Sequence, residues 1–138
     1  SEPVIRGPKD SFTENYQINE DAILIIKDGS GVGKVQYGTD KFSVIGTLNY
    51  LSAKKEINLR YILFCLKFFN FGKYKVGSGI PHIYFKDYGE AFIYCPSLDE
   101  QNKTERLLSF IYKKINIEKI LLSKYEIQKK HLLQNLFI

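Results

Sequence analysis

The hydrophobic residues of this chain follow two different patterns, and the change falls at Pro96. Before it, apolar residues gather in short runs of strand length, whereas after it they recur in steps of three and four. Short β-branched and aromatic runs are typical of strands, and the longer repeat is typical of an amphipathic helix. Ser97 and Glu100 have the S-x-x-E spacing of a capping box, which predicts that the helix begins at Leu98. We therefore predict two domains, 1–96 and 97–138.

The first domain is predicted to contain a small twisted sheet, mixed or antiparallel. The run AILIIK over 22–27 has strand length, the glycine-rich segment 28–33 predicts a turn, and a return strand follows near 34–37. Further extended segments, rich in β-branched and aromatic residues, are predicted over 42–45, 47–51, 82–85 and 91–94.

One shorter helix is predicted inside this domain. Asn58 is a suitable N-cap, and the apolar residues after it follow the 3.6-residue period up to Phe69, before Gly72. The predicted fold class is α+β: a small sheet domain with one or two helices, followed by a long C-terminal coiled-coil helix.

The long helix carries an apolar seam. A helix over 98–138 would span roughly 60 Å at 1.5 Å per residue, so part of the seam is expected to meet another helix. The residues predicted to make this contact with a partner helix are Leu108, Ile111, Ile115, Leu122, Tyr125, Leu132 and Leu136.

Charge favours an acidic partner without proving one. The 138 residues carry a formal net charge of +5, and the pI is about 9.1. Positive residues concentrate in the middle of the chain, from Lys54 to Lys86, and Glu56 is the only acidic residue in this range. No apolar run is long enough to span a bilayer and no leader peptide is recognisable, so we expect no membrane contact and a cytoplasmic location.

Several catalytic chemistries lack their residues. The segment DGSGVGK is not a phosphate-binding loop, because only three residues separate Gly29 from Gly33 and Val35 stands where a Ser or Thr should follow the lysine. The E-x-K or D-x-K pair of a metal-dependent nuclease and the Pro-Pro of a nucleic-acid methyltransferase motif are missing from the sequence. His82 and His131 fall on different predicted elements. We predict no catalysis by this chain alone.

The two cysteines also give no sign of a metal or redox site. Cys65 and Cys95 each lie inside an apolar run, which is typical of small buried hydrophobic residues. We therefore predict neither a metal nor a cofactor.

Three motifs resemble those of a known family. They are DGSGVGKV at 28–35, GSGIPHIYFKDY at 77–88 and PSLDEQNK at 96–103, followed by a helix with a basic pair, Lys129 and Lys130, before its last apolar residues. Each motif is weak by itself, but their order and spacing are fairly specific. From about Ala22 to its end, the chain resembles half of a specificity subunit of type I restriction-modification systems.

This resemblance implies a non-catalytic subunit that recognises DNA. In that family, a target-recognition domain reads half of a bipartite site, and two halves pack their spacer helices antiparallel. Methyltransferase subunits dock on the assembly, and a restriction subunit is a further partner. The second half would be an identical copy or a different half-subunit.

One departure from the family leaves an alternative open. A family domain usually carries more strand sequence before the position of Ala22 than this chain does. The alternative is an assembly module, a truncated or orphan half-subunit that dimerises through its helix without reading DNA.

If the first domain binds DNA, its loops and basic residues are the candidates for contact. A solvated surface position is the simpler interpretation of each lysine, and a half-buried sheet position that of each tyrosine. The predicted phosphate contacts are Lys34, Lys41, Lys54, Lys55, Lys73 and Lys75, and the predicted base or stacking contacts are Tyr37, Asn49, Tyr50, Tyr74, Ser78 and His82.

Overall fold

The structure is a computed structural model that describes residues 5–6, 20–39, 46–54 and 56–136. The chain divides into two compact units, Ser1–Asn102 and Lys103–Ile138, and each is described by itself.

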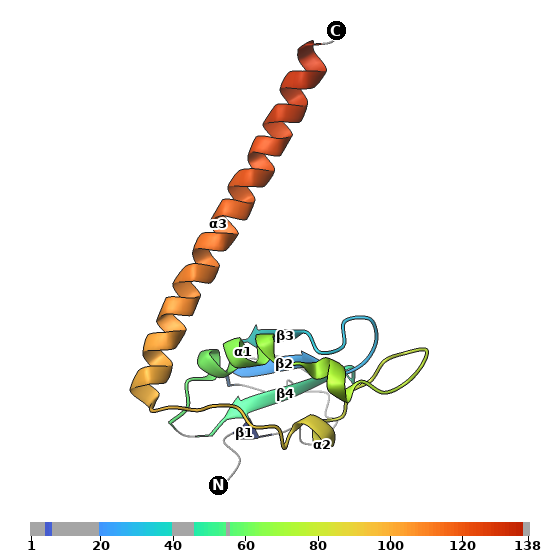
Figure 1. Ribbon diagram of the computed structural model, residues 1–138, viewed down its shortest axis with the longest axis vertical. Coiled ribbons are helices and arrows are strands. Elements are labelled where there is room, and N and C mark those ends of the chain that lie inside the picture. The colour runs from blue at the N-terminus through green and yellow to red at the C-terminus, as the bar shows by residue number, and fades with distance from the viewer. Residues whose placement is uncertain (1–4, 7–19, 40–45, 55, 137–138) are drawn as a thin grey trace. The chain divides into compact units, whose positions relative to one another are not determined.

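An antiparallel sheet lies at the centre of the first unit (Figure 1). Its three main strands are β2 (Ala22–Ile26), β3 (Val35–Gly38) and β4 (Leu48–Ala53), with β2 in the middle. The two-residue strand β1 (Ile5–Arg6) pairs with the outer side of β4. Ile23 lies opposite both Tyr37 and Leu51, so these three side chains share one face of the sheet. The predicted sheet and α+β class are confirmed; the strand predicted over 42–45 lies outside the described residues.

The turn between β2 and β3 depends on two glycines. Gly29 and Gly33 both have φ of +86°, a conformation that L side chains rarely adopt. At Gly33 space is also missing, because an added Cβ would lie 2.8 Å from the Cβ of Phe71. The turn folds inward at Val32, which is buried in the core. This agrees with the glycine turn predicted from the sequence.

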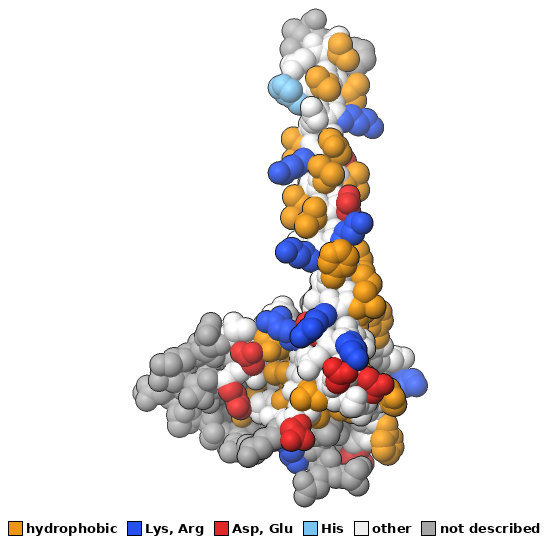
Figure 2. Space-filling view, turned by 90° about the vertical axis from the view of Figure 1, so that its left-hand side faces the viewer, with side chains coloured by type: hydrophobic (Ala, Val, Ile, Leu, Met, Phe, Trp, Pro, Cys, Tyr) orange, Lys and Arg blue, Asp and Glu red, His pale blue; other side chains and the backbone are white. Residues whose placement is uncertain are grey.

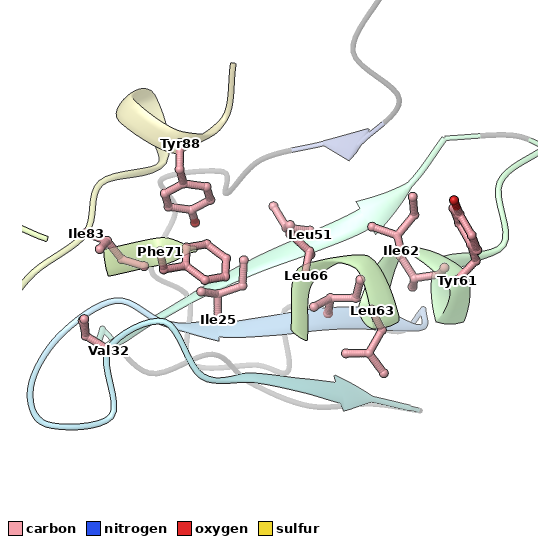
Figure 3. Close-up of a cluster of buried hydrophobic side chains, with 12 residues drawn as sticks. Ile25, Val32, Leu51, Tyr61, Ile62, Leu63, Leu66, Phe71, Ile83 and Tyr88 are labelled. Carbon is pink, nitrogen blue, oxygen red and sulfur yellow. The ribbon is translucent and has the colours of Figure 1, made fainter. Parts of the chain in front are cut away.

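Helix α1 (Leu59–Phe68) supplies much of the core. Its N-cap is Asn58, as predicted, and the Asn58 side chain accepts a hydrogen bond from the backbone N–H of Tyr61 at 3.0 Å. The apolar stripe of α1 packs with the face of the sheet that carries Ile25 and Leu51 (Figure 3). The core is closed by Phe71 from the 3-10 helix η1 (Phe71–Tyr74), and by Ile83 and Tyr88 from later segments.

Two predictions after residue 80 are wrong. Phe85 does not continue an extended segment but begins the one-turn helix α2 (Phe85–Tyr88). The segment 91–94 alternates as a strand should, yet it pairs with no strand among the described residues. The Tyr94 carbonyl instead accepts a hydrogen bond from the Tyr61 hydroxyl at 2.9 Å. Phe92 and Tyr94 are 99% and 80% exposed, so this alternation points aromatic rings to solvent instead of into a sheet.

Helix α3 (Leu98–Leu136) begins where the capping box predicts. The Ser97 N–H donates to Glu100 Oε2 at 3.2 Å, and the Glu100 N–H donates to Ser97 Oγ at 3.4 Å. Its first residues belong to the first unit, and the rest forms the second. Among the helices described, none is long and apolar enough to cross a membrane.

Candidate nucleic-acid interface

Two loops join at one end of the sheet. The β2–β3 turn, 27–34, and the segment 75–83 are linked by backbone hydrogen bonds from Gly29 N–H to the Pro81 carbonyl at 3.0 Å and from Ile83 N–H to the Lys27 carbonyl at 2.9 Å. Both project from the same end of the first unit (Figure 1). We call these two segments the double loop. Their glycines let the chain turn sharply, and the hydrogen bonds hold one loop against the other.

His82 lies at the centre of the double loop. Its backbone N–H and carbonyl both pair with Val76, at 2.8 and 2.9 Å, which closes the second loop on itself. Its Nδ1 lies 2.5 Å from Asp28 Oδ1, which ties the second loop to the first. His82 was predicted as a DNA contact, whereas Asp28 was overlooked because fifty-four residues separate the two in the chain.

The tip of the second loop is formed by 77–80. Gly77 has φ of +94°, and an added Cβ there would lie 2.6 Å from the Ile80 carbonyl oxygen. Ser78, a predicted base contact, is exposed on this tip. Behind it, the His82 ring stacks with Tyr84 at 6.4 Å between ring centroids, and the Lys86 ammonium lies 5.6 Å from the Tyr84 centroid.

Lysines surround these loops. Lys34 on the first loop, and Lys73 and Lys75 at the entry to the second, are all exposed, as predicted phosphate contacts should be. Lys27, in the first loop, and Lys86, three residues after the second, add positive charge, against Asp28 and Asp87. A set of cations of this kind attracts a polyanion such as a phosphate backbone.

The first unit holds Tyr37 by its own contacts. The Tyr37 hydroxyl donates to Asp21 Oδ2 at 2.8 Å, and the Arg60 guanidinium lies 4.2 Å from the ring centroid. Burial, reinforced by Asp21, raises the pKa of Tyr37 to about 12. The ring therefore already has a cationic partner from α1.

Asn49 lies in the interior and not at the surface. It is only 5% exposed, and its Nδ2 donates to the Tyr88 hydroxyl at 2.9 Å. We therefore leave Asn49 out of any interface.

The remaining predicted contacts are packed within the first unit, lie on another part of the sheet or fall outside the described residues. Tyr74 stacks on Phe69, with 5.8 Å between centroids and a 9° angle between ring planes. Tyr50 is half-buried and lies opposite Leu24, on the face of the sheet turned away from Ile23. Lys54 is half-buried beyond the end of β4, and Lys41 and Lys55 lie outside the described residues. The structure thus gathers Lys34, Lys73, Lys75, Ser78 and His82 at one end.

At the other end of the sheet, Gln101 joins the start of α3 to the start of α1. It is 2% exposed, its Oε1 accepts from the Asn58 backbone N–H at 3.0 Å, and its Nε2 donates to the Pro96 carbonyl at 2.8 Å. Asn58 Nδ2 also donates to Asn102 Oδ1 at 2.7 Å. The sequence placed Gln101 in a motif but gave no physical reason to expect it buried.

The second unit presents its apolar seam to solvent. Orange side chains run along α3 in Figure 2. From Phe110 to Leu136 every residue is exposed, so the predicted seam residues Ile111, Ile115, Leu122, Tyr125, Leu132 and Leu136 are all exposed. Leu108, nearer the helix start, is half-buried. A stripe of this length is available for another helix.

A metal site needs several thiol, imidazole or carboxylate groups close together. Within the described ranges, no three His, Cys, Asp or Glu side chains are grouped so that they could hold a metal ion. Cys65 and Cys95 are unbridged and half-buried, and burial raises the pKa of the Cys65 thiol. Gln101 Nε2 also lies 3.3 Å from Cys95 Sγ.

A small α+β domain that ends in a long helix is a fold found among known DNA specificity proteins. The family described as the type I restriction modification DNA specificity domain matches residues 9–126. The chain belongs to this family.

A solved structure gives the same fold. The chain is similar to the S subunit of a type I restriction-modification system from M. genitalium, with a TM-score of 0.60 and 20% sequence identity. The match covers 78% of this chain but only 30% of that subunit, so the chain spans less than a third of its length. No curated protein sequence matches the chain.

Proposed function

We propose that this chain is a DNA-recognition half-subunit of a type I restriction-modification enzyme, and that its first unit reads one half of a bipartite site. The observation that carries the proposal is the family match over 9–126, which includes the double loop and most of α3. The exposed lysines of the double loop support it, because phosphate contacts position a protein on DNA while side chains at base edges read sequence.

In this proposal α3 supplies symmetry and spacing. Its exposed seam would pack against the same helix of a second copy or of another half-subunit, so that two first units read two half-sites. Methyltransferase subunits would dock on this assembly, with the restriction subunit as a further partner. The chain itself would be cytoplasmic, would catalyse nothing and would need no cofactor. We assign 1–96 to recognition and 97–138 to pairing.

The experiment is sedimentation equilibrium of the purified chain, alone and with a pool of random duplexes at low salt, followed by sequencing of the retained DNA. The proposal expects a dimer that enriches a gapped, two-part motif. A dimer that retains DNA without enriching any sequence would contradict the reading role.

Matched charge variants locate the DNA contact. Replacing Lys73 and Lys75 with Gln should weaken binding and lower the slope of log affinity against log salt by about two. Replacing Lys119 and Lys124 of α3 with Gln removes the same charge and should leave that slope unchanged. Equal effects of the two double variants would show that only net charge attracts DNA.

One observation favours the alternative of an assembly module. The apolar seam lies in the second unit and involves none of the double-loop residues, so pairing does not require DNA reading. A chain that dimerises fully, binds methyltransferase subunits and shows no salt-dependent retention of any duplex would be such a module.

A further inference from the structure

An exposed aliphatic side chain occupies the tip of the double loop. Ile80 is 65% exposed and follows Gly77, Ser78 and Gly79. A single exposed apolar residue is ordinary on a protein surface. Ile80, however, lies among small residues on a projecting loop and has no part in the hydrophobic core. Both segments of the double loop also carry lysines.

The loop holds Ile80 in a fixed position. Gly77 brings its backbone against the Ile80 carbonyl, so closely that any side chain at Gly77 would collide with it. The next residue, Pro81, fixes its own φ, and its carbonyl accepts from Gly29. The His82–Asp28 contact then ties this segment to the first loop. A loop whose backbone is held in this way loses little freedom when it binds, which favours a specific contact by the side chain that it presents.

Small neighbours give Ile80 access to a base edge. Ser78 and Gly79 extend no large side chain beside it, and an added Cβ at Gly79 would meet nothing within 4 Å. In the major groove the 5-methyl group of thymine is the apolar feature of a base edge, and apolar side chains recognise it by contact. Lys34, Lys73 and Lys75 are exposed and would supply the phosphate contacts that position the loop for such a groove contact.

We propose that Ile80 is a specificity-determining residue that contacts the 5-methyl group of a thymine in the half-site, an assignment that rests on the proposed DNA-reading function. It was not among the residues predicted from sequence. The contact adds an apolar attraction to a surface on which Lys34, Lys73 and Lys75 attract DNA by charge, without reading its sequence.

Uracil in place of thymine tests this contact with a change of one methyl group. The motif enriched by the full-length chain is synthesised with each thymine in turn replaced by uracil. At one thymine position, replacement in a single half-site should weaken binding of the unaltered chain by about fourfold, the value that corresponds to one buried methyl-sized group. The Ile80→Ala chain should bind the thymine and uracil duplexes equally at that position.

Two controls separate a specific contact from general damage. Val76→Ala shortens another exposed apolar residue of the same loop and should keep the thymine preference. Ile80→Val retains a branched methyl surface and should keep most of it. Each variant is first shown to unfold at the same denaturant concentration as the unaltered chain, which is expected because Ile80 lies outside the core.

The outcomes are distinct. If the unaltered chain enriches a motif but Ile80→Ala keeps the same thymine preference, this inference fails and the DNA-reading function stands. If Ile80→Ala weakens all duplexes alike, Ile80 contacts DNA without reading a methyl group, and the inference also fails. If the unaltered chain enriches no motif, the proposed function itself is wrong and the inference falls with it.

Discussion

The two units of this chain differ in whether their apolar residues are buried. In Ser1–Asn102 the large apolar side chains of β2, β4 and α1 meet one another, and Ile23, Ile25 and Ile62 are completely buried. In the described part of Lys103–Ile138 the apolar residues lie along a single helix, and those from Phe110 to Leu136 are exposed. The first unit has a core of its own, whereas the second has an apolar seam that would be buried only against another helix.

This difference determines whether each unit should be stable without a partner. A closed core stabilises the loops at its edge, so the double loop can keep its shape without a partner. A single helix has no comparable tertiary support, and helical stability in proteins comes mostly from packing an apolar face. The second unit should therefore depend on association, and the first should not.

The largest effect is expected from charges placed in the seam. Ile111→Asp with Leu122→Asp should convert a dimer to a monomer, because an unpaired charge in a dry helix interface costs roughly 3–5 kcal/mol. Sedimentation equilibrium measures the change. Asn116→Asp with Gln128→Glu adds the same two charges at residues outside the predicted seam and should leave the dimer intact. If the seam variant keeps the mass of the unaltered chain, the exposed stripe is not the dimer contact.

A core truncation should affect the first unit alone. Ile62→Ala empties a completely buried position on α1 and should lower the free energy of unfolding by about 2–5 kcal/mol. Phe68→Ala on the same helix, at a side chain 77% exposed, is the matched control and should cost far less. Urea unfolding followed by tyrosine fluorescence reports mainly the first unit, which holds eight of the ten tyrosines. Equal losses for the two variants would mean that α1 does not pack as described.

Local sequence patterns predicted the elements that are stabilised locally. The AILIIK strand, the glycine turn, the Asn58 cap and the Ser97–Glu100 box each rest on residues a few positions apart, and each is confirmed. The segment 91–94 shows the limit of this approach. Alternation reports which side chains point to the same side, but not whether a strand edge is free to pair.

The candidate site was harder to predict because it depends on long-range packing. Composition could not show that Asn49 is buried and bonded to Tyr88, which lies 39 positions later in the chain. Nor could it pair Asp28 with His82 across the chain. Gln101 occupies the first turn of an amphipathic helix, where a polar residue normally faces water. Its burial follows from the fold around Asn58.

A smaller effect is expected where the units meet in the chain, at Gln101. Gln101→Leu keeps the volume but leaves the Asn58 backbone N–H without its acceptor, which should cost about 1–3 kcal/mol of unfolding free energy. Hydrogen exchange at the Asn58 amide should accelerate at the same time. Asn102→Ala removes the hydrogen bond from the Asn58 side chain but leaves the Asn58 backbone N–H bonded to Gln101. The Asn58 backbone amide should therefore exchange more slowly in Asn102→Ala than in Gln101→Leu.

The smallest effect concerns alkaline pH and again distinguishes the two units. Burial raises the pKa of Tyr88 to about 12 from its ordinary value of 10.0, while Asn49 opposes the shift by hydrogen bonding. Between these two values an unfolded chain would lose the Tyr88 proton and a folded one would keep it. The contribution of Tyr88 to the free energy of unfolding is therefore fully present below pH 10 and is lost as the pH rises towards 12. Tyr37 and Tyr61, with pKa values also raised to about 12, act in the same direction.

Replacing the hydroxyl tests this assignment directly. Tyr88→Phe should be less stable at neutral pH, because Asn49 loses its partner, but should lose less stability per pH unit above pH 10. Denaturant midpoints at several pH values measure both quantities. Tyr125→Phe, on the exposed seam of the second unit, serves as the control and should reproduce the pH dependence of the unaltered chain. An unchanged slope in Tyr88→Phe would mean that the alkaline loss arises from Tyr37 and Tyr61 alone.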